Sequence, residues 1–222
     1  MLLAIDTSTR TVGIALYDGV QVLSELIWTS SNFHTVELAP AITQLFNWAD
    51  SSVRALSGIV VATGPGSFTG IRIGLAVAKG LALARGIPLI GVPTLDFLAA
   101  AQPAYDLPLA AVLRAGRDRL AVGWYRLEEE AWVPWRTAVS MTAEELSARI
   151  NKPTLVCGEL NDEERRLLAR KRVNVTLLSP AHSLRRPSFL AELGWERLES
   201  GQVDDPASLS PIYLHTDGQI PG

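Results

Sequence analysis

The fold of the first half of this chain is decided by the stretch Gly64-Pro65-Gly66-Ser67-Phe68-Thr69-Gly70-Ile71-Arg72-Ile73-Gly74. It follows an uncharged, mostly apolar run, residues 58–63, and it opens a long helix of small residues that reaches Arg85. A strand, a glycine loop and a helix in this order are typical of an anion site, because free N–H groups and the helix dipole point into the loop. Whether the loop holds a phosphate therefore decides whether the chain acts as an enzyme.

The spacing of the glycines excludes the two commonest phosphate motifs. Ile71 and Arg72 stand where a Walker loop has Lys followed by Ser or Thr. A dinucleotide fingerprint would also need an acidic residue at the end of the next strand, where this chain has Val92. Two interpretations stay open: an anion site, or glycines that serve turn geometry and close helix packing.

The overall composition excludes several classes of protein. The 222 residues carry 20 basic against 23 acidic side chains, a net charge of -3, which argues against a stand-alone polyanion binder. The single cysteine, Cys157, excludes an internal disulfide and fits a reducing compartment. The first residues lack a basic segment typical of a signal peptide, and no apolar run is long enough for a membrane span. We expect a cytoplasmic protein without membrane contact.

The first half of the chain alternates strand and helix patterns in a recognisable order. Apolar runs predict strands at 2–5, 12–17, 21–28, 58–63 and 88–92. Helices are predicted at 35–50, from the glycine stretch to Arg85, and at 94–101 with Thr94 as a cap. Three meandering strands followed by right-handed crossovers match one half of the ribonuclease-H/actin-like architecture. In that fold an Asp at the end of the first strand lies beside the phosphate-binding turn, and Asp6 has that place.

The second half repeats this order loosely after a linker at 102–106. Strands are predicted at 109–113, 120–127, 132–139, 154–158 and 173–177, and helices at 142–150, 161–171 and 187–200. We therefore expect an α/β fold of two related βββαβα-type subdomains, residues 1–102 and 103–222, with the last helix free to return to the first subdomain.

Few residues are candidates for chemistry. A vestigial nucleotide site would use Asp6, Thr7, Gly64, Gly66, Ser67 and Gly70, although an Asp-Thr-Ser-Thr turn also forms by bonding to its own backbone. Three isolated histidines, His34, His182 and His215, show no metal-ligand spacing, so no metal site is expected. The basic run at 165–172 fits a solvated helix face better than a tRNA contact.

The two helices of the first half are more apolar than one sheet contact requires. Residues 71–84 carry only Arg72 and Lys79 as charges, and a helix that is apolar almost all round is buried on more than one side. In a chain of this size the second side needs either the neighbouring helix or a partner. A charge at Leu75 or Ala78 is then expected to abolish pairing and leave the fold intact.

Four segments together closely resemble the bacterial TsaB (YeaZ) family. They are Leu3-Ala4-Ile5-Asp6-Thr7-Ser8, His34-Thr35 with Pro40, the glycine stretch 64–74, and Gly91-Val92-Pro93-Thr94-Leu95. Pro211-Ile212-Tyr213-Leu214 is similar to the closing motif of the family, with His215 in place of its Arg. The resemblance is dense over residues 1–100 and sparse after that.

This resemblance implies an actin-like fold and a role in making threonylcarbamoyladenosine in tRNA. The family implies a non-catalytic subunit that binds and activates the transferase TsaD in a complex with the ATPase TsaE. ATP and metal are then expected on those partners, and tRNA contact only through the complex. Pairing with TsaD, or homodimerisation without it, is implied to use the first two helices, with interface residues Val36, Ala39, Thr43, Phe46, Ile71, Leu75, Ala78 and Ala82.

The chain also departs from the family at the start of its second half. The family often has Asp-Ala-Arg there, whereas this chain reads Leu113-Arg114-Ala115-Gly116-Arg117-Asp118, so a basic residue replaces a carboxylate. Two alternatives remain: an actin-like phosphotransferase, which needs a second phosphate loop, and a metalloprotease of the same superfamily, which needs paired histidines. The second half supplies only isolated glycines, and the histidines are unpaired.

Overall fold

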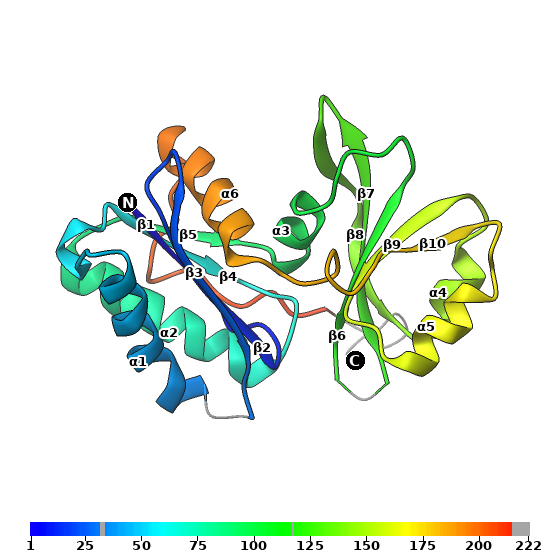
Figure 1. Ribbon diagram of the computed structural model, residues 1–222, viewed down its shortest axis with the longest axis horizontal. Coiled ribbons are helices and arrows are strands. Elements are labelled where there is room, and N and C mark those ends of the chain that lie inside the picture. Colours follow the sequence, from blue (N-terminus) through cyan, green and yellow to red (C-terminus); the bar gives the residue numbers. More distant parts are fainter. Residues whose placement is uncertain (32–33, 117, 215–222) are drawn as a thin grey trace. The chain divides into compact units, whose positions relative to one another are not determined.

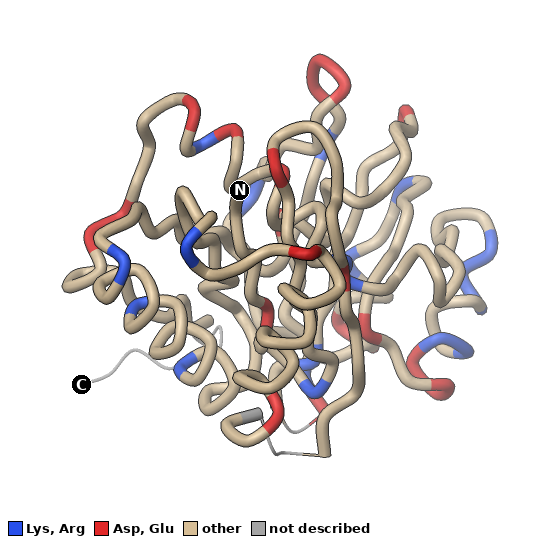
Figure 2. Tube along the Cα trace, turned by 60° about the vertical axis from the view of Figure 1, so that its left-hand side comes forward, with Lys and Arg blue, Asp and Glu red and all other residues tan. Residues whose placement is uncertain are grey.

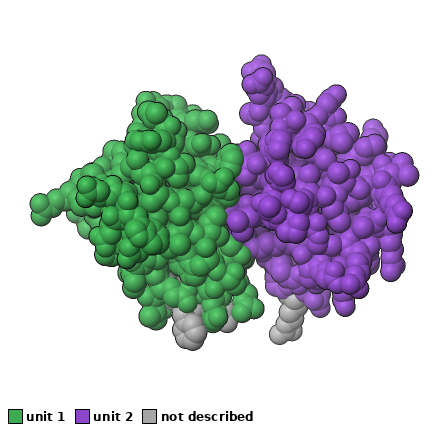
Figure 3. All heavy atoms as spheres, viewed as in Figure 1, with its two compact units in different colours: residues 1–97, 186–212 green, residues 98–185, 213–222 purple. Residues whose placement is uncertain are grey.

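The computed structural model describes residues 1–31, 34–116 and 118–214 and divides into two compact units (Figures 1 and 3). Unit 1 comprises residues 1–97 and 186–212, and unit 2 comprises residues 98–185 and the chain from 213. The first boundary lies at 97/98 rather than at the expected 102/103. Residues 186–212 belong to unit 1, as the sequence-based division allowed for the last helix, because helix α6 (Pro187–Glu199) packs on the first sheet.

The sheet of unit 1 has the strand order β3-β2-β1-β4-β5. Its strands are β1 (Leu2–Asp6), β2 (Thr11–Tyr17), β3 (Val22–Thr29), β4 (Gly58–Ala62) and β5 (Leu89–Val92). The first three form an antiparallel meander, and β4 and β5 add in parallel. This is the topology expected from the sequence, and the α/β, actin-like fold class is confirmed.

Alternation along the strands divides the core of unit 1 between two faces of the sheet. Leu3 and Ile5 pack with helices α1 (His34–Trp48) and α2 (Phe68–Arg85), while Leu2 and Ala4 pack on the α6 side (Figure 1). Successive strand residues point to opposite faces, so a strand buried on both faces reads as a continuous apolar run. The short 3₁₀ helix η1 (Val53–Ala55) also belongs to unit 1, and the boundary between the units falls within helix α3 (Thr94–Ala100).

Unit 2 has a second five-stranded sheet in the order β10-β9-β6-β7-β8. Its elements are β6 (Leu109–Arg114), β7 (Leu120–Glu128), β8 (Ala131–Met141), α4 (Ala143–Arg149), β9 (Thr154–Gly158), α5 (Asp162–Ala169) and β10 (Val175–Leu177). Thr142 and Asn161 each close a capping box at the starts of α4 and α5; the sequence predicts the box at Thr142 and a cap at Asn161.

A few element boundaries differ from those expected. The strand predicted from Val173 begins only at Val175, because a turn around Lys171 accepts hydrogen bonds from the N–H groups of Asn174 and Val175. Helix α2 ends at Arg85, as the sequence predicts, and Gly86 follows it in the left-handed conformation that commonly ends a helix. Among the described residues, no helix is both long and apolar enough to cross a membrane.

Candidate functional site

The glycine loop of unit 1 packs directly against the turn that follows β1. The N–H of Ser67 donates to the Ser8 carbonyl oxygen at 2.6 Å. A Cβ on Gly66 would lie 2.2 Å from that same oxygen, and one on Gly70 would lie 2.2 Å from the Thr7 oxygen. Any side chain at these two positions would collide with backbone, so the glycines are required by the close approach of two chain segments.

Several N–H groups of the loop are bonded within the protein. Ser67 caps α2 by accepting from the Gly70 N–H at 3.3 Å, and its carbonyl accepts from the Ile71 N–H at 3.0 Å. The Gly64 N–H donates to Thr94 Oγ1 at 3.1 Å. The Ile71 bond is the ordinary first i→i−4 bond of the helix, whereas the Ser67 and Gly70 N–H groups lie at the helix start, where an anion would bind. The internal bonds of these two groups favour the packing interpretation over the phosphate interpretation.

The structure brings the six vestigial-site candidates together at the ends of β1 and β4. Asp6 is buried and accepts a hydrogen bond from the Ser8 N–H at 2.8 Å, which is the Asx-type turn considered for it. Thr7 Oγ1 donates to the Gly70 carbonyl at 2.7 Å and so ties β1 to the first turn of α2. The cluster is a structural junction built from side chains and backbone of unit 1.

Thr94 belongs to the same junction, and sequence reasoning assigned it a different role. It was expected to cap α3, but it is the first residue of that helix. Its hydroxyl lies 2.8 Å from Ser8 Oγ as well as accepting from Gly64. The motif Val92-Pro93-Thr94-Leu95 contained the signal, since a buried hydroxyl two residues after a strand can reach the neighbouring strand end.

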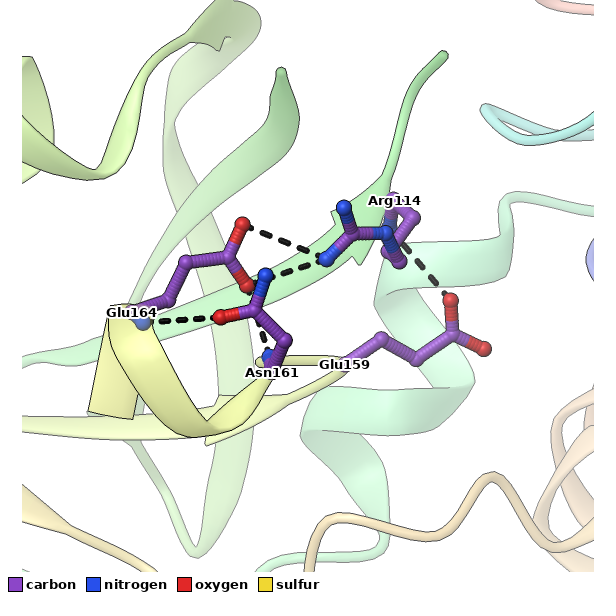
Figure 4. Close-up of polar contacts among 4 residues, drawn as sticks. All are labelled: Arg114, Glu159, Asn161 and Glu164. Atoms are coloured by element: carbon purple, nitrogen blue, oxygen red, sulfur yellow. Dashed lines mark hydrogen bonds and ion pairs between the residues drawn. The ribbon is translucent and has the colours of Figure 1, made fainter. Parts of the chain in front are cut away.

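Arg114, which departs from the family pattern, is neutralised inside unit 2 (Figure 4). Its guanidinium donates to both carboxylate oxygens of Glu164, at 3.0 and 3.2 Å, and its N–H donates to Glu159 at 3.4 Å. Glu164 also accepts from the Asn161 N–H as part of the capping box of α5. Glu159 in turn pairs with the buried Arg185. The basic residue therefore anchors the end of β6 to α5.

Five of the eight expected interface residues lie in the core of unit 1. Phe46, Ile71, Leu75, Ala78 and Ala82 are all buried. These five side chains pack within the protein, because the apolar surface of α2 is covered by α1 as well as by the sheet. This corrects the expectation that a charge at Leu75 or Ala78 leaves the fold intact, since it would be placed in a closed core.

Val36, Ala39 and Thr43 remain exposed, as does a wider set of uncharged neighbours on both helices. We call this set the outer face; it comprises Val36, Ala39, Pro40, Thr43, Gln44, Asn47 and Trp48 of α1 and Phe68, Ala76, Gly80, Leu83 and Ala84 of α2. Val36, Leu83 and Trp48 are 68%, 69% and 58% exposed. The charged residues of α2 are all basic, and Figure 2 shows where basic and acidic residues lie along the chain. The guanidinium carbon of Arg72 lies 3.6 Å from the Phe68 ring centroid.

The other candidates have local partners or lie outside the described residues. Within the described ranges, no group of three or more His, Cys, Asp or Glu side chains is placed to hold a metal ion. His182 Nδ1 lies 3.0 Å from Ser179 Oγ, whereas the side chain of His34 and the whole of His215 lie outside the description. In the basic run, Arg166 pairs with Asp162 at 2.7 Å, and Arg165 donates to the Leu178 carbonyl.

Comparisons with known proteins agree with this geometry. The family model described as TsaD, tRNA N6-adenosine threonylcarbamoyltransferase, matches residues 22–161. The tRNA threonylcarbamoyladenosine biosynthesis protein TsaB of Bacillus subtilis is 34% identical over 217 residues, which cover 96% of this chain and 93% of that protein. The structure of YeaZ from Pseudomonas aeruginosa matches with a TM-score of 0.79 at 25% identity, covering 96% of this chain and 99% of that one.

A more distant structure shares only the fold. The ethanolamine utilization protein EutJ from Carboxydothermus hydrogenoformans matches with a TM-score of 0.51 at 15% identity, over 86% of this chain and 88% of that one. The near-complete coverage of a TsaB protein and of YeaZ, together with the TsaD family match, shows the family. The chain belongs to the TsaB (YeaZ) family, a paralogue of the TsaD transferases.

Proposed function

We propose that this protein is a non-catalytic subunit of tRNA threonylcarbamoyladenosine biosynthesis that binds and activates TsaD in a complex with TsaE. In this proposal ATP and metal are held by the partner subunits, and the protein acts in the cytoplasm. The observation that carries the proposal is the outer face of α1 and α2, where the large apolar side chains of Val36, Trp48 and Leu83 are exposed.

The composition of the outer face supports protein pairing. Exposed surfaces of monomeric proteins rarely gather large apolar side chains, and depletion of charge with aromatic enrichment is typical of interface centres. Trp48 and Phe68 supply exposed aromatic rings. The small residues Ala39, Ala76 and Gly80 allow a partner helix to approach the backbone closely. The same face would form a homodimer when TsaD is absent, as isologous interfaces do.

The junction around the glycine loop supports a non-catalytic role. Gly66 and Gly70 are held against the carbonyls of Ser8 and Thr7, and the Ser67 and Gly70 N–H groups at the start of α2 donate within the protein. A phosphotransferase would have to free these two donors before it could use them to bind a phosphate. The metalloprotease alternative lacks support because the described residues contain no metal-ligand cluster.

Pairing is tested best by a charge on the outer face. Ala76 is exposed in the middle of α2, so Ala76→Glu should preserve the fold, with Arg72 one turn away, and bury a carboxylate only when TsaD binds. Because removing an ion from water costs several kcal/mol, we expect the affinity for TsaD to fall by at least about 100-fold. The affinity is measured by titration calorimetry, and pairing is followed by co-elution of the purified proteins.

Ala148→Glu is the matched control, because Ala148 is also an exposed helical alanine but lies in α4 of unit 2. It should leave pairing unchanged. Retained co-elution of TsaD with the Ala76→Glu variant would show that the outer face is not the interface. Equal loss in both variants would point to a general effect of charge.

Catalysis is tested on the isolated protein and on the reconstituted system. We expect no metal-dependent hydrolysis or phosphoryl transfer by the protein alone, but a strong dependence of tRNA modification by TsaD and TsaE on its presence. The readout is the modified nucleoside, measured by mass spectrometry after tRNA digestion. Turnover by the protein alone that disappears in Asp6→Ala would contradict the non-catalytic assignment.

A further inference from the structure

Unit 2 contains a pocket of about 380 Å³ beside the β7–β8 ribbon and the end of α4. It is lined by Pro108, Trp124, Trp135, Arg136, Arg149, Ile150, Asn151, Lys152 and Thr154. Two indole rings and three cationic side chains line it, without a carboxylate. The volume lies in the range of small-molecule sites, about 300–1,000 Å³. A local excess of positive charge is unexpected in a chain with a net charge of -3.

An irregularity in β8 explains why Trp135 and Arg136 line the same pocket. Trp124 pairs with Arg136 and Tyr125 pairs with Pro134, so Trp135 is an extra residue in the ladder. In a regular strand two neighbours point to opposite faces, and a β-bulge breaks that alternation. The guanidinium carbon of Arg136 lies 4.0 Å from the Trp135 ring centroid, which places a planar cation against an indole that is 39% exposed.

The opposite wall is formed by the end of α4 and the segment that leads to β9. Thr154 Oγ1 donates to the Lys152 carbonyl at 2.9 Å. Lys171 Nζ donates to the Ile150 carbonyl at 3.2 Å and brings a fourth cation to this wall. These bonds hold the backbone from which Arg149 and Lys152 line the pocket. The cations therefore project from an ordered wall.

We propose that this pocket binds a nucleotide, presented as an unpaired residue of RNA. Bases stack on aromatic rings and on guanidinium planes, and each base has a face that can do so. The Trp135–Arg136 pair supplies such a surface, while Arg149 and Lys152 face the adjoining phosphate. A base inside a duplex is covered on both faces, so paired RNA does not fit this chemistry.

The identity of the ligand as RNA rests on the proposed function, whereas the nucleotide chemistry rests on the pocket. With few cations in one pocket and a negative net charge overall, binding by the isolated protein is weak and sensitive to salt. In the assembled complex this contact would add to those made by the partner subunits.

The test uses the full-length protein and a short fluorescein-labelled single-stranded RNA, with anisotropy read at about 50 and 200 mM salt. Trp135→Ala should weaken binding at least about fivefold, because a base loses its stacking partner. Arg136→Gln and Lys152→Gln should each lower the slope of log affinity against log salt by roughly 0.7. Circular dichroism checks that each variant folds like the parent.

Two matched controls lie outside the pocket. Tyr105→Ala removes an exposed aromatic ring from the segment before β6, and Arg166→Gln removes an exposed arginine from α5. Neither should change RNA affinity. The source of the nucleotide is separated by competition: displacement by a blunt RNA duplex should be poor, and displacement by AMP alone at equal nucleotide concentration would identify a free mononucleotide as the ligand of the same pocket.

Three results would overturn the inference. They are absence of RNA and AMP binding at low salt, an equal loss in the control variants, and duplex binding that is unaffected by Trp135→Ala. The pairing test with Ala76→Glu concerns a different unit, so its failure with RNA binding retained would count against the proposed function alone. Absence of RNA and AMP binding by the parent protein, with its pairing to TsaD intact, would count against the pocket alone.

Discussion

At the scale of single residues, the glycines of α2 have opposite roles although they lie on one helix. A Cβ at Gly70 would lie 2.2 Å from a backbone oxygen, whereas a Cβ at Gly80 would have nothing within 4 Å. Gly70 is thus required by the junction with the β1 end. Gly80 lies on the exposed outer face, where its backbone freedom lowers helix stability.

This contrast predicts opposite effects of the same substitution. Gly70→Ala should lower the free energy of unfolding by about 1–3 kcal/mol, as overpacking does. Gly80→Ala should raise it by up to about 1 kcal/mol, because alanine favours the helix. Urea unfolding of both variants measures the difference. Similar stabilities for the two would show that the junction yields easily, and the packing interpretation of the loop would then lose its basis.

At the scale of elements, the start of helix α6 is held on the sheet by a carboxylate of strand β3. Its N-cap residue, Arg186, makes no side-chain cap bond. Glu25 of β3 instead accepts from the Ser188 N–H at 3.0 Å and pairs with Arg186 at 2.6 Å. Burial alone would raise the pKa of Glu25, but the hydrogen bonds from Arg186 and Ser188 outweigh it and lower that pKa below its ordinary value of 4.5.

Glu25→Gln should therefore destabilise the protein by about 1–2 kcal/mol at neutral pH, through loss of a charge-assisted cap. A lowered pKa means that the stabilisation is complete above the ordinary value of 4.5 and is lost as pH falls through the lower folded-state value. The difference in unfolding free energy between variant and parent should therefore become smaller in that acid range. Thermal unfolding at several pH values measures it, with the exposed Glu199→Gln as control. A difference that is constant down to the most acid pH would rule out Glu25 as the charged cap.

At the scale of the whole molecule, the two units differ in how the chain builds them. The sheet and the core of unit 2 come from residues 98–185, whereas unit 1 needs residues 186–212 to cover the second face of its sheet. Gly194 shows how closely α6 is docked, since a Cβ there would lie 2.6 Å from Val60 Cβ. The first unit is therefore completed only by the end of the described chain.

Ending the chain at Arg185 should consequently unfold unit 1 in preference to unit 2. Without α6, the apolar face that includes Leu2, Val60 and Ile90 would be exposed to water. Hydrogen–deuterium exchange should show loss of protection in β1 and β4, with protection retained in β6 and β9. Equal protection of both sheets in the shortened chain would contradict this division.

Local patterns in the sequence were sufficient for the element order, the helix caps at Thr142 and Asn161, and the stop at Gly86. Each of these depends on residues a few positions apart, so spacing and turn chemistry determine it. The family resemblance rested on short segments of the same kind. The glycine spacing also showed that the loop matches neither of two common phosphate-binding motifs, although it left the role of the loop open.

Only the tertiary structure decided which residues of the apolar helices are buried and which are exposed. Phe46 and Leu75 looked like interface residues because periodicity cannot distinguish a sheet, a neighbouring helix and a partner as the covering surface. Local spacing likewise could not show that Thr94 forms a hydrogen bond with Ser8 across the junction, or that a bulge places Trp135 in the lining of a pocket. The sequence by itself determined the local elements and the family. The packing of residues far apart in the chain decided the junction, the outer face and the pocket, because distance in space is not encoded in local spacing.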